Sequence, residues 1–591
     1  MFAYKIYQFS NRCEAIIKVS QRQESHKQEF ILMGGHCGLA VLHGEASVQG
    51  YTITKENSSH SKLLFVGSFP HSNNQIVVVN CRSKKNDETL DKNILYDAFP
   101  KRKDIIDCVA RDFKYGDLIL FLAKKESPSV LLCNRAFSKE IFNTKPYQGD
   151  KVFDDLYILD KDRYKMDNFY KCANVISELE GMKTSIKCGI MENFIIVTTG
   201  GSKAGKSSLN RYITNNFLSM PNVKVYWADF DIEHPEFTPS GVLSLTHVKE
   251  PLLTPAHMHF KGYVECGFLY GKNNLEFEDQ RYYSIISEIN RAYGKITLQD
   301  QSSIHVLIIN TLSITSEIGK QLMERIFNTY KVSICFSCPT SKVSKYIPKS
   351  FNKDRFITVT NNSYDIQNST HINIHRKTLE RMFFTSYFGL IFDGENNSIF
   401  SWDPSFWPYH KVPFSKVKMF IDENLNDLER DHFADALNVT LVALCVETDN
   451  NCGGFVENDV NKSGTLKSLK YVYRGKTGSI KFNRTNLKLV GFGIITNIDE
   501  VLGNFHICTP LTKKELSTVN VIARERHFVI PAEMIELQDK DKATYGVLHT
   551  SDSEWLYWNK SLVRGFDNSN KNDYRYINDN NLMNKKPRRY F

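Results

Sequence analysis

Long apolar runs are missing from this 591-residue chain. The longest, Val439–Val446, is far shorter than the roughly 20 residues that a membrane-spanning helix requires. No basic segment followed by an apolar one opens the sequence, whose first eight residues have the pattern of a strand. We therefore expect neither membrane insertion nor secretion.

Cysteine spacing of the kind found in disulfide frameworks is also missing. The 13 cysteines are scattered and odd in number, which favours a reducing compartment. One CxxC pair, Cys335 and Cys338, follows an apolar run but has no second CxxC or paired histidine beside it. We predict buried strand thiols there rather than a zinc or redox site.

The overall composition is that of a globular protein. Hydrophobic residues make up 41% of the chain and charged residues 24%, which argues against a mostly disordered chain. At roughly 150 residues per domain, the length predicts about three or four domains.

The net charge of +9 is not spread evenly. Ordinary solubility explains such an excess as well as an anionic partner does. Residues 560–591 alone hold eight Lys or Arg against three Asp, with Tyr and Phe between them. We interpret 559–591 as a basic aromatic tail that binds RNA or a protein partner, the alternative being a solvated end.

Three hydrophobic patterns follow one another along the chain. Residues 1–172 carry short period-two runs, which predict an all-β domain. Residues 173–400 alternate apolar strands with helical segments, which predicts an α/β core whose parallel sheet is covered on both faces. Residues 401–558 return to strand-like runs and predict a β-rich domain. In the core we expect strands at 194–198, 223–228, 305–309 and 332–336, and helices at 174–183, 207–217, 282–293 and 318–330.

One motif in the core indicates phosphate binding. Residues 200–207, Gly-Gly-Ser-Lys-Ala-Gly-Lys-Ser, match G-x-x-x-x-G-K-[ST] between a predicted strand and a predicted helix. In such a P-loop, backbone N–H groups hold the β-phosphate, the lysine contacts the β- and γ-phosphates and the next hydroxyl ligates Mg²⁺. We predict these roles for Lys206 and Ser207. The predicted nucleotide-binding residues are Gly200, Gly201, Ser202, Lys203, Ala204, Gly205, Lys206, Ser207 and Ser208.

Two acidic residues, Asp229 and Asp231, follow the next predicted strand. A carboxylate beside a P-loop can hold a Mg²⁺-bound water or accept the proton of an attacking hydroxyl. We predict that both belong to the metal site and to the catalytic set, and their spacing leaves open which is the base. A turn at the strand end is the alternative.

Motifs of other P-loop classes are absent. No [NT]KxD segment follows, so guanine specificity is not indicated, and no DxxG switch or motor-type sensor pattern accompanies the aspartates. A kinase-like or scaffold-like P-loop protein remains.

The segment 229–245, Asp-Phe-Asp-Ile-Glu-His-Pro-Glu-Phe-Thr-Pro-Ser-Gly-Val-Leu-Ser-Leu, resembles a family stretch. It is similar to the D-x-D-x-G-Q-P-E-F-T-P-P-G of eukaryotic polynucleotide 5′-hydroxyl kinases. Pro-Glu-Phe-Thr-Pro at 235–239 points to the branch that processes ribosomal RNA rather than to the messenger-RNA cleavage-factor kinases. The resemblance covers most of the chain and implies a β domain, a P-loop kinase domain and a second β-rich domain.

Two further elements resemble that family. Ile309–Thr311 and Gly319 are similar to its I-N-T-x-G-W-x-x-G-x-G clasp, and Arg376 and Arg381 to its paired lid arginines. The resemblance implies that these arginines are catalytic, covering the γ-phosphate and stabilising charge on the transferring phosphoryl group. From the residues alone, a solvated helix face explains them as well.

The chain also departs from the family pattern. Glu233-His234 replaces the Gly-Gln that follows D-x-D, and Ser313-Ile314 replaces the Gly-Trp of the clasp, so a Trp expected to clamp the acceptor RNA end is absent. We interpret the chain as an active but divergent kinase; the alternative is an ATP-binding scaffold that has lost transfer. A small-metabolite kinase is a third reading, which leaves both β domains without a role.

The resemblance further implies cofactors, partners and location. ATP would be the phosphoryl donor and Mg²⁺ the metal. The acceptor would be pre-rRNA with a 5′-hydroxyl end, left by an endoribonuclease that cuts the second internal transcribed spacer and assembles with the kinase. Residence in the nucleus and nucleolus would follow.

Overall fold

The computed structural model describes the chain in segments. They are residues 4–20, 30–68, 76–81, 89–125, 133–134, 136–137, 149–154, 156–160, 172–189, 193–259, 263–271, 280–313, 317–339, 347–348, 351–359, 376–392, 409–421, 437–447, 470–473, 487–499, 501–525 and 528–531. The basic tail at 559–591 lies outside them. In the described part of the chain, no helix combines the length and the apolar character needed to span a membrane.

The N-terminal strands form one antiparallel sheet of ten strands. Its long strand β3 pairs with β7 and β10 through its first half and with β6 and β8 through its second half, so a single strand joins the two parts of the sheet. The strands are β1 (Tyr4–Gln8), β2 (Glu14–Val19), β3 (Phe30–His43), β4 (Glu45–Val48), β5 (Tyr51–Thr54), β6 (Leu64–Gly67), β7 (Ile76–Asn80), β8 (Leu118–Ala123), β9 (Gly149–Phe153) and β10 (Leu156–Leu159).

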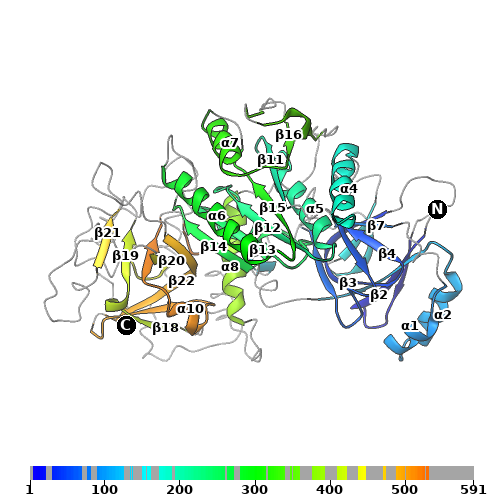
Figure 1. The fold of residues 1–591 in the computed structure, drawn as a ribbon. Helices are drawn as coiled ribbons and strands as arrows, with labels where there is room; N and C mark the ends of the chain where they lie inside the picture. Colours follow the sequence, from blue (N-terminus) through cyan, green and yellow to red (C-terminus); the bar gives the residue numbers. More distant parts are fainter. Residues whose placement is uncertain are drawn as a thin grey trace, which may run out of the picture.

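Among the described residues of the N-terminal region, two helices accompany this sheet, and the period-two runs did not predict them. They are α1 (Lys92–Ala98) and α2 (Lys103–Asp112), on the side away from the central sheet (Figure 1). Ile106 and Val109 of α2 pack on Phe9 and Phe121, because side chains spaced by three lie on one face of a helix. The helices therefore cover one face of the β structure.

The central sheet confirms the predicted α/β core. Its parallel strands lie in the order β17-β16-β11-β15-β12, and the four predicted strands are among them. Helices α4 and α5 cover one face and α6 and α7 the other. The elements are β11 (Phe194–Gly200), β12 (Val223–Asp229), β15 (Ile304–Asn310), β16 (Ile334–Cys338), β17 (Phe356–Thr358), α4 (Ala173–Lys187), α5 (Lys206–Leu218), α6 (Gln280–Gln299) and α7 (Glu317–Thr329).

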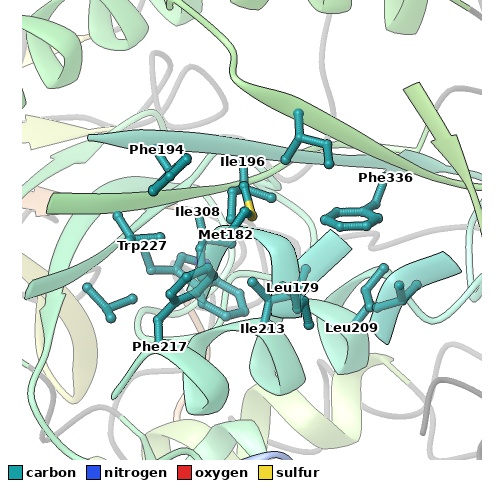
Figure 2. Close-up of a cluster of buried hydrophobic side chains, with 14 of the residues drawn as sticks. Leu179, Met182, Phe194, Ile196, Leu209, Ile213, Phe217, Trp227, Ile308 and Phe336 are labelled. Atoms are coloured by element: carbon teal, nitrogen blue, oxygen red, sulfur yellow. The ribbon is translucent and has the colours of Figure 1, made fainter. Parts of the chain in front are cut away.

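Side-chain alternation along β12 shows why both faces are covered. Val225 and Trp227 join the apolar cluster under α4 and α5, whereas Tyr226 and Ala228 join the cluster under α6 and α7. Figure 2 shows the first cluster, where side chains of α4 and α5 meet those of the strands. Cys335 and Cys338 are free and buried in β16, which confirms the prediction of strand thiols.

The central sheet is mixed and continues into the C-terminal strands. Strand β13 pairs antiparallel with β12, β14 pairs antiparallel with β13, and β14 also pairs with β22, so one sheet of 14 strands spans both regions. The N-terminal sheet and the C-terminal strands lie at opposite ends of it (Figure 1). The added strands are β13 (Val242–Val248), β14 (Tyr263–Leu269), β18 (Tyr409–Pro413), β19 (Lys418–Ile421), β20 (Thr440–Glu447), β21 (Lys470–Tyr473), β22 (Leu487–Asp499), β23 (Asn504–Cys508) and β24 (Val521–Arg524).

Helix α8 (Arg376–Gly389) packs on the C-terminal strands, with the short helix α10 (Lys513–Leu516) further along the chain. Phe384 and Phe388 of α8 are buried in one cluster with Phe492 of β22. Because aromatic side chains bury a large apolar area, this cluster holds α8 against the C-terminal end of the long sheet.

The N-terminal sheet is docked on helix α5, which begins at the P-loop. Asn215 of α5 donates to the carbonyl of Gln49 at 2.9 Å and also exchanges hydrogen bonds with the backbone of Leu252. Ser219 accepts from the N–H of Thr52 at 2.9 Å. The turn between β4 and β5 thus lies directly on the P-loop helix.

We predict that Gly50→Ala loosens this docking. Gly50 has a φ of +88°, and an added methyl group would lie 2.6 Å from Asn216 Nδ2 and 2.8 Å from the Tyr212 carbonyl. Gly189→Ala is the matched control, because Gly189 has a φ of +78° and nothing within 4 Å. Both variants carry backbone strain of about 1–2 kcal/mol. In denaturant unfolding, we expect the unfolding free energy of Gly50→Ala to fall by about 1–3 kcal/mol more than that of Gly189→Ala. Equal losses would contradict the docking.

Candidate functional site

The P-loop connects the end of β11 to the start of α5. Gly200, Lys203 and Gly205 have φ values of 145°, 59° and 87°, which place them outside the conformations that ordinary residues prefer. A Cβ on Gly200 would lie 2.1 Å from the carbonyl oxygen of Cys338, the residue opposite it on β16. Glycine is therefore required where the loop leaves the sheet.

The loop ends at the N-terminus of α5. Gly205 is the N-cap residue, and since glycine has no side chain it cannot accept from the N–H groups of the first turn. Those N–H groups and the positive end of the helix dipole suit a bound anion. The hydroxyl groups of Ser207 and Ser208, both half-buried, lie in this first turn.

Lys206 is folded into the loop. Its side chain is buried, and Nζ donates to the carbonyl of Gly201 at 3.0 Å. Burial lowers the pKa of Lys206, and the nearby negative charge of Asp231 opposes that shift. The lysine and the aspartate that the sequence separates by 25 positions are therefore electrostatic neighbours.

Asp229 is fully buried at the end of β12. Asn310 Nδ2 donates to Oδ1 at 2.9 Å and the Glu236 N–H to Oδ2 at 2.5 Å, while Asn210 Nδ2 of α5 donates to Asn310 at 3.3 Å. Burial raises the pKa of Asp229 well above its usual range, although the two hydrogen bonds act the other way. This carboxyl group joins strand β12, strand β15 and the segment that follows β12.

Asp231 shapes that segment. Its Oδ1 accepts from the N–H groups of Glu233 at 3.0 Å and His234 at 3.1 Å. Only backbone atoms of residues 233 and 234 take part in these bonds, and neither residue has a positive φ. The turn is therefore compatible with Glu-His at the two positions where the sequence pattern described above has Gly-Gln.

The residues present fit a nucleotide and Mg²⁺. The described residues contain no cluster of three or more His, Cys, Asp or Glu side chains that would hold a metal by itself. Mg²⁺ at nucleotide sites is held by one or two protein oxygens together with substrate phosphates. Ser207, in the first turn of α5, and Asp231, whose charge acts on Lys206, offer such oxygens.

Two clasp residues, Asn310 and Thr311, form hydrogen bonds within the central sheet. Asn310 holds Asp229, and Thr311 Oγ1 donates to the carbonyl of Thr198 at 2.7 Å. Ser313 is described, whereas Ile314 lies outside the described residues. The first half of the clasp therefore orders the strand ends around the P-loop.

The two arginines proposed as a lid lie on α8. Arg376 begins the helix, and its side chain is outside the described residues. The guanidinium of Arg381 donates to Thr378 Oγ1 at 3.1 Å and lies 5.8 Å from the centre of the Phe137 ring. Their role at the γ-phosphate stays a prediction.

A buried charge cluster beside the P-loop was missed by the sequence reasoning. Arg211 of α5 contacts Glu236 through two hydrogen bonds, Nε to Oε1 at 2.7 Å and Nη2 to Oε2 at 3.0 Å. His259 Nδ1 lies 2.6 Å from the same Oε1. Glu236 lies in the Pro-Glu-Phe-Thr-Pro motif, but nothing in the spacing of the sequence indicates that Arg211 and His259 are its partners.

The protonation states in this cluster follow from burial and charge. Burial alone would raise the pKa of Glu236, but the Arg211 charge and the hydrogen bonds from His259 and Arg211 bring it to about 2. Burial lowers the pKa of His259. An ionised carboxylate only accepts hydrogen bonds, so the neutral imidazole carries its proton on Nδ1.

Comparison with known proteins agrees with this geometry. Residues 200–389 match the family model described as mRNA cleavage and polyadenylation factor CLP1 P-loop. The chain is 25% identical to polynucleotide 5′-hydroxyl-kinase nol-9 of Caenorhabditis briggsae over 380 residues, 63% of each chain. It is 25% identical to polynucleotide 5′-hydroxyl-kinase NOL9 of Homo sapiens over 375 residues, 56% of this chain and 48% of that one.

A solved Clp1p–Pcf11p complex is also similar, with a TM-score of 0.47 and 12% identity over 84% of this chain and 98% of that chain. The chain aligns with less than two thirds of the length of the worm and human kinases. It is a distant homologue of polynucleotide 5′-hydroxyl kinases with a Clp1-like P-loop domain.

We predict that Glu236 makes the fold sensitive to acid. Its pKa of about 2 lies below the usual 4.5, so its contribution is present above pH 4.5 and is lost as the pH falls toward 2. Between pH 6 and pH 3 this carboxyl group should account for about 2 kcal/mol of lost unfolding free energy.

Denaturant titrations of wild type and Glu236→Gln across that range measure the effect. The difference in unfolding free energy between the two proteins should narrow as the pH falls, because only wild type has a carboxylate at position 236 that can be protonated. A gap independent of pH would show that Glu236 is not ionised in the folded protein.

Proposed function

We propose that this chain is an ATP-dependent polynucleotide 5′-hydroxyl kinase. The observation that carries the proposal is the phosphate-shaped P-loop, in which Lys206 is folded onto the Gly201 carbonyl and the charge of Asp231 acts on its pKa. Distant homology to proteins named as such kinases supports the reaction class.

The P-loop residues would bind ATP through their backbone. The N–H groups of residues 200–208 hold the phosphates, and Lys206 exchanges its bond to Gly201 for the β- and γ-phosphates. Ser207 and Asp231 would hold Mg²⁺, which would supply neutralisation of the phosphate charge. Arg376 and Arg381 add positive charge from α8 if that helix approaches the γ-phosphate.

Asp231 is the better candidate for the catalytic base. Asp229 is 0% exposed and both of its oxygens accept hydrogen bonds, whereas Asp231 is 7% exposed and lies near the lysine charge. In the transfer, the 5′-hydroxyl oxygen bonds to the γ-phosphorus as its proton passes to Asp231. The bond from that phosphorus to the bridging oxygen breaks, and the electron pair leaves with ADP.

The acceptor and the setting follow the ribosomal-RNA branch. We propose cleaved pre-rRNA with a 5′-hydroxyl end at the second internal transcribed spacer, an endoribonuclease partner, and residence in the nucleus and nucleolus. The basic tail at 559–591 is the proposed contact with RNA or with the nuclease.

We predict that Lys206→Ala abolishes transfer. Loss of the lysine charge at the transferring phosphoryl group should lower kcat by about 10³-fold. The measurement is transfer of label from [γ-³²P]ATP to a 5′-hydroxyl RNA oligonucleotide, with and without co-expressed nuclease. Lys224→Ala is the control, because Lys224 lies near the start of β12 and pairs with Asp300. Bound ATP without label in wild type would instead support a scaffold.

A second prediction separates the two aspartates. Asp231→Asn should lower kcat by about 10²–10⁴-fold with little change in unfolding free energy, since it removes a proton acceptor. Asp229→Asn should destabilise the fold. Both oxygens of Asp229 accept hydrogen bonds, from Asn310 Nδ2 and from the Glu236 N–H, and the substitution replaces one of these acceptors with an NH₂ group that can only donate. Rate and denaturant unfolding are measured on both variants. A reversed pattern would assign the base role to Asp229.

A further inference from the structure

We infer that the buried Arg211–Glu236 ion pair is a positioning device that fixes Asp231 against the P-loop, an inference that rests on the proposed kinase function. The pair joins two elements that must hold one geometry during phosphoryl transfer. Arg211 follows Lys206 by five residues on α5, and Glu236 follows Asp231 by five residues in the next segment.

The pair is built for orientation. Both guanidinium contacts are short, at 2.7 and 3.0 Å, and they form the two-pronged arrangement that sets direction as well as distance. The Arg211 side chain is 18% exposed and that of Glu236 2%. A buried ion pair adds little stability over apolar side chains of the same volume, so stability explains its presence poorly.

Glu236 also closes the segment that carries Asp231. Its N–H donates to Asp229 Oδ2 at 2.5 Å, so residues 230–235 form a loop held at both ends. Inside that loop, Asp231 accepts from residues 233 and 234. The direction of the Asp231 carboxylate therefore depends on where Glu236 is held.

A third contact reaches the Glu236 oxygen that Arg211 Nε also holds, Oε1. His259 donates from Nδ1 at 2.6 Å, and Phe237 packs between Trp227 and the His259 ring. The segment 251–259 that carries His259 also contacts the N-terminal sheet through Leu253. Glu236 thus connects α5, the end of β12 and a segment docked on the β domain.

Loss of the Arg211–Glu236 pair should affect the transfer step more than the binding of ATP. The P-loop N–H groups hold the phosphates of ATP without help from Glu236, whereas Asp231 acts on the hydroxyl proton and on Mg²⁺. Loosening the pair should lower kcat about 10–100-fold, since misplacement by about 1 Å costs that much. The Kd for ATP should change less than about threefold.

The experiment compares Arg211→Lys, Arg211→Met and Glu236→Gln with wild type. Arg211→Lys keeps the charge but loses the two-pronged contact, so its kcat should lie between those of wild type and Arg211→Met. Lys18→Met is the matched control, because Lys18 forms a buried pair with Asp117 in the N-terminal sheet at 3.2 Å. It should lose stability and keep kcat.

The readouts are kcat, the KM and Kd for ATP, and amide hydrogen exchange with Mg²⁺ and a non-hydrolysable ATP analogue. We expect faster exchange at 230–236 in the Arg211 variants while the P-loop amides stay protected. An equal kcat loss in Lys18→Met, or unchanged exchange at 230–236, overturns the inference. If wild type transfers no phosphate but the Arg211 variants still exchange faster than wild type at 230–236, the kinase proposal is overturned and the positioning role is supported.

Discussion

Three carboxyl groups within eight residues, those of Asp229, Asp231 and Glu236, are each less than a tenth exposed, and the site depends on how their charge is compensated. Burying an ionised carboxylate is costly unless hydrogen bonds and opposite charges replace water. Each group is accommodated differently: Asp229 has two hydrogen-bond donors and a pKa raised by burial, Asp231 has backbone N–H donors, and Glu236 has a guanidinium. Three neighbouring acids therefore have three different sets of partners.

The same compensation links the P-loop to its surroundings. Helix α5 supplies Lys206 to the phosphate loop, Asn210 to the strand-end network, Arg211 to Glu236 and Asn215 to the N-terminal sheet. These contacts leave the helix on different sides because the residues are spaced around its turns. Helix α5 therefore contacts the phosphate loop, the Asp231 segment and the docked β domain at once.

The departures from the family pattern have unequal physical weight. Glu233 and His234 contribute backbone N–H groups to the Asp231 turn, so that substitution leaves the described geometry intact. Ser313 follows Thr311, whose hydroxyl donates to the Thr198 carbonyl, and Ile314, which stands where the resemblance has Trp, lies outside the described residues. The described geometry therefore accounts for the Glu233-His234 departure.

Local pattern determined the elements, and tertiary packing decided their partners. The strands, the core helices and the P-loop were predictable because side-chain periodicity and loop chemistry are encoded in neighbouring residues. The sequence alone could not show that Gly200 meets the carbonyl of Cys338, that Glu236 pairs with Arg211, or that β14 joins β22 into one sheet. Those contacts join residues far apart in the chain, and which of them meet depends on strand order and on the burial of charge, which no single segment specifies.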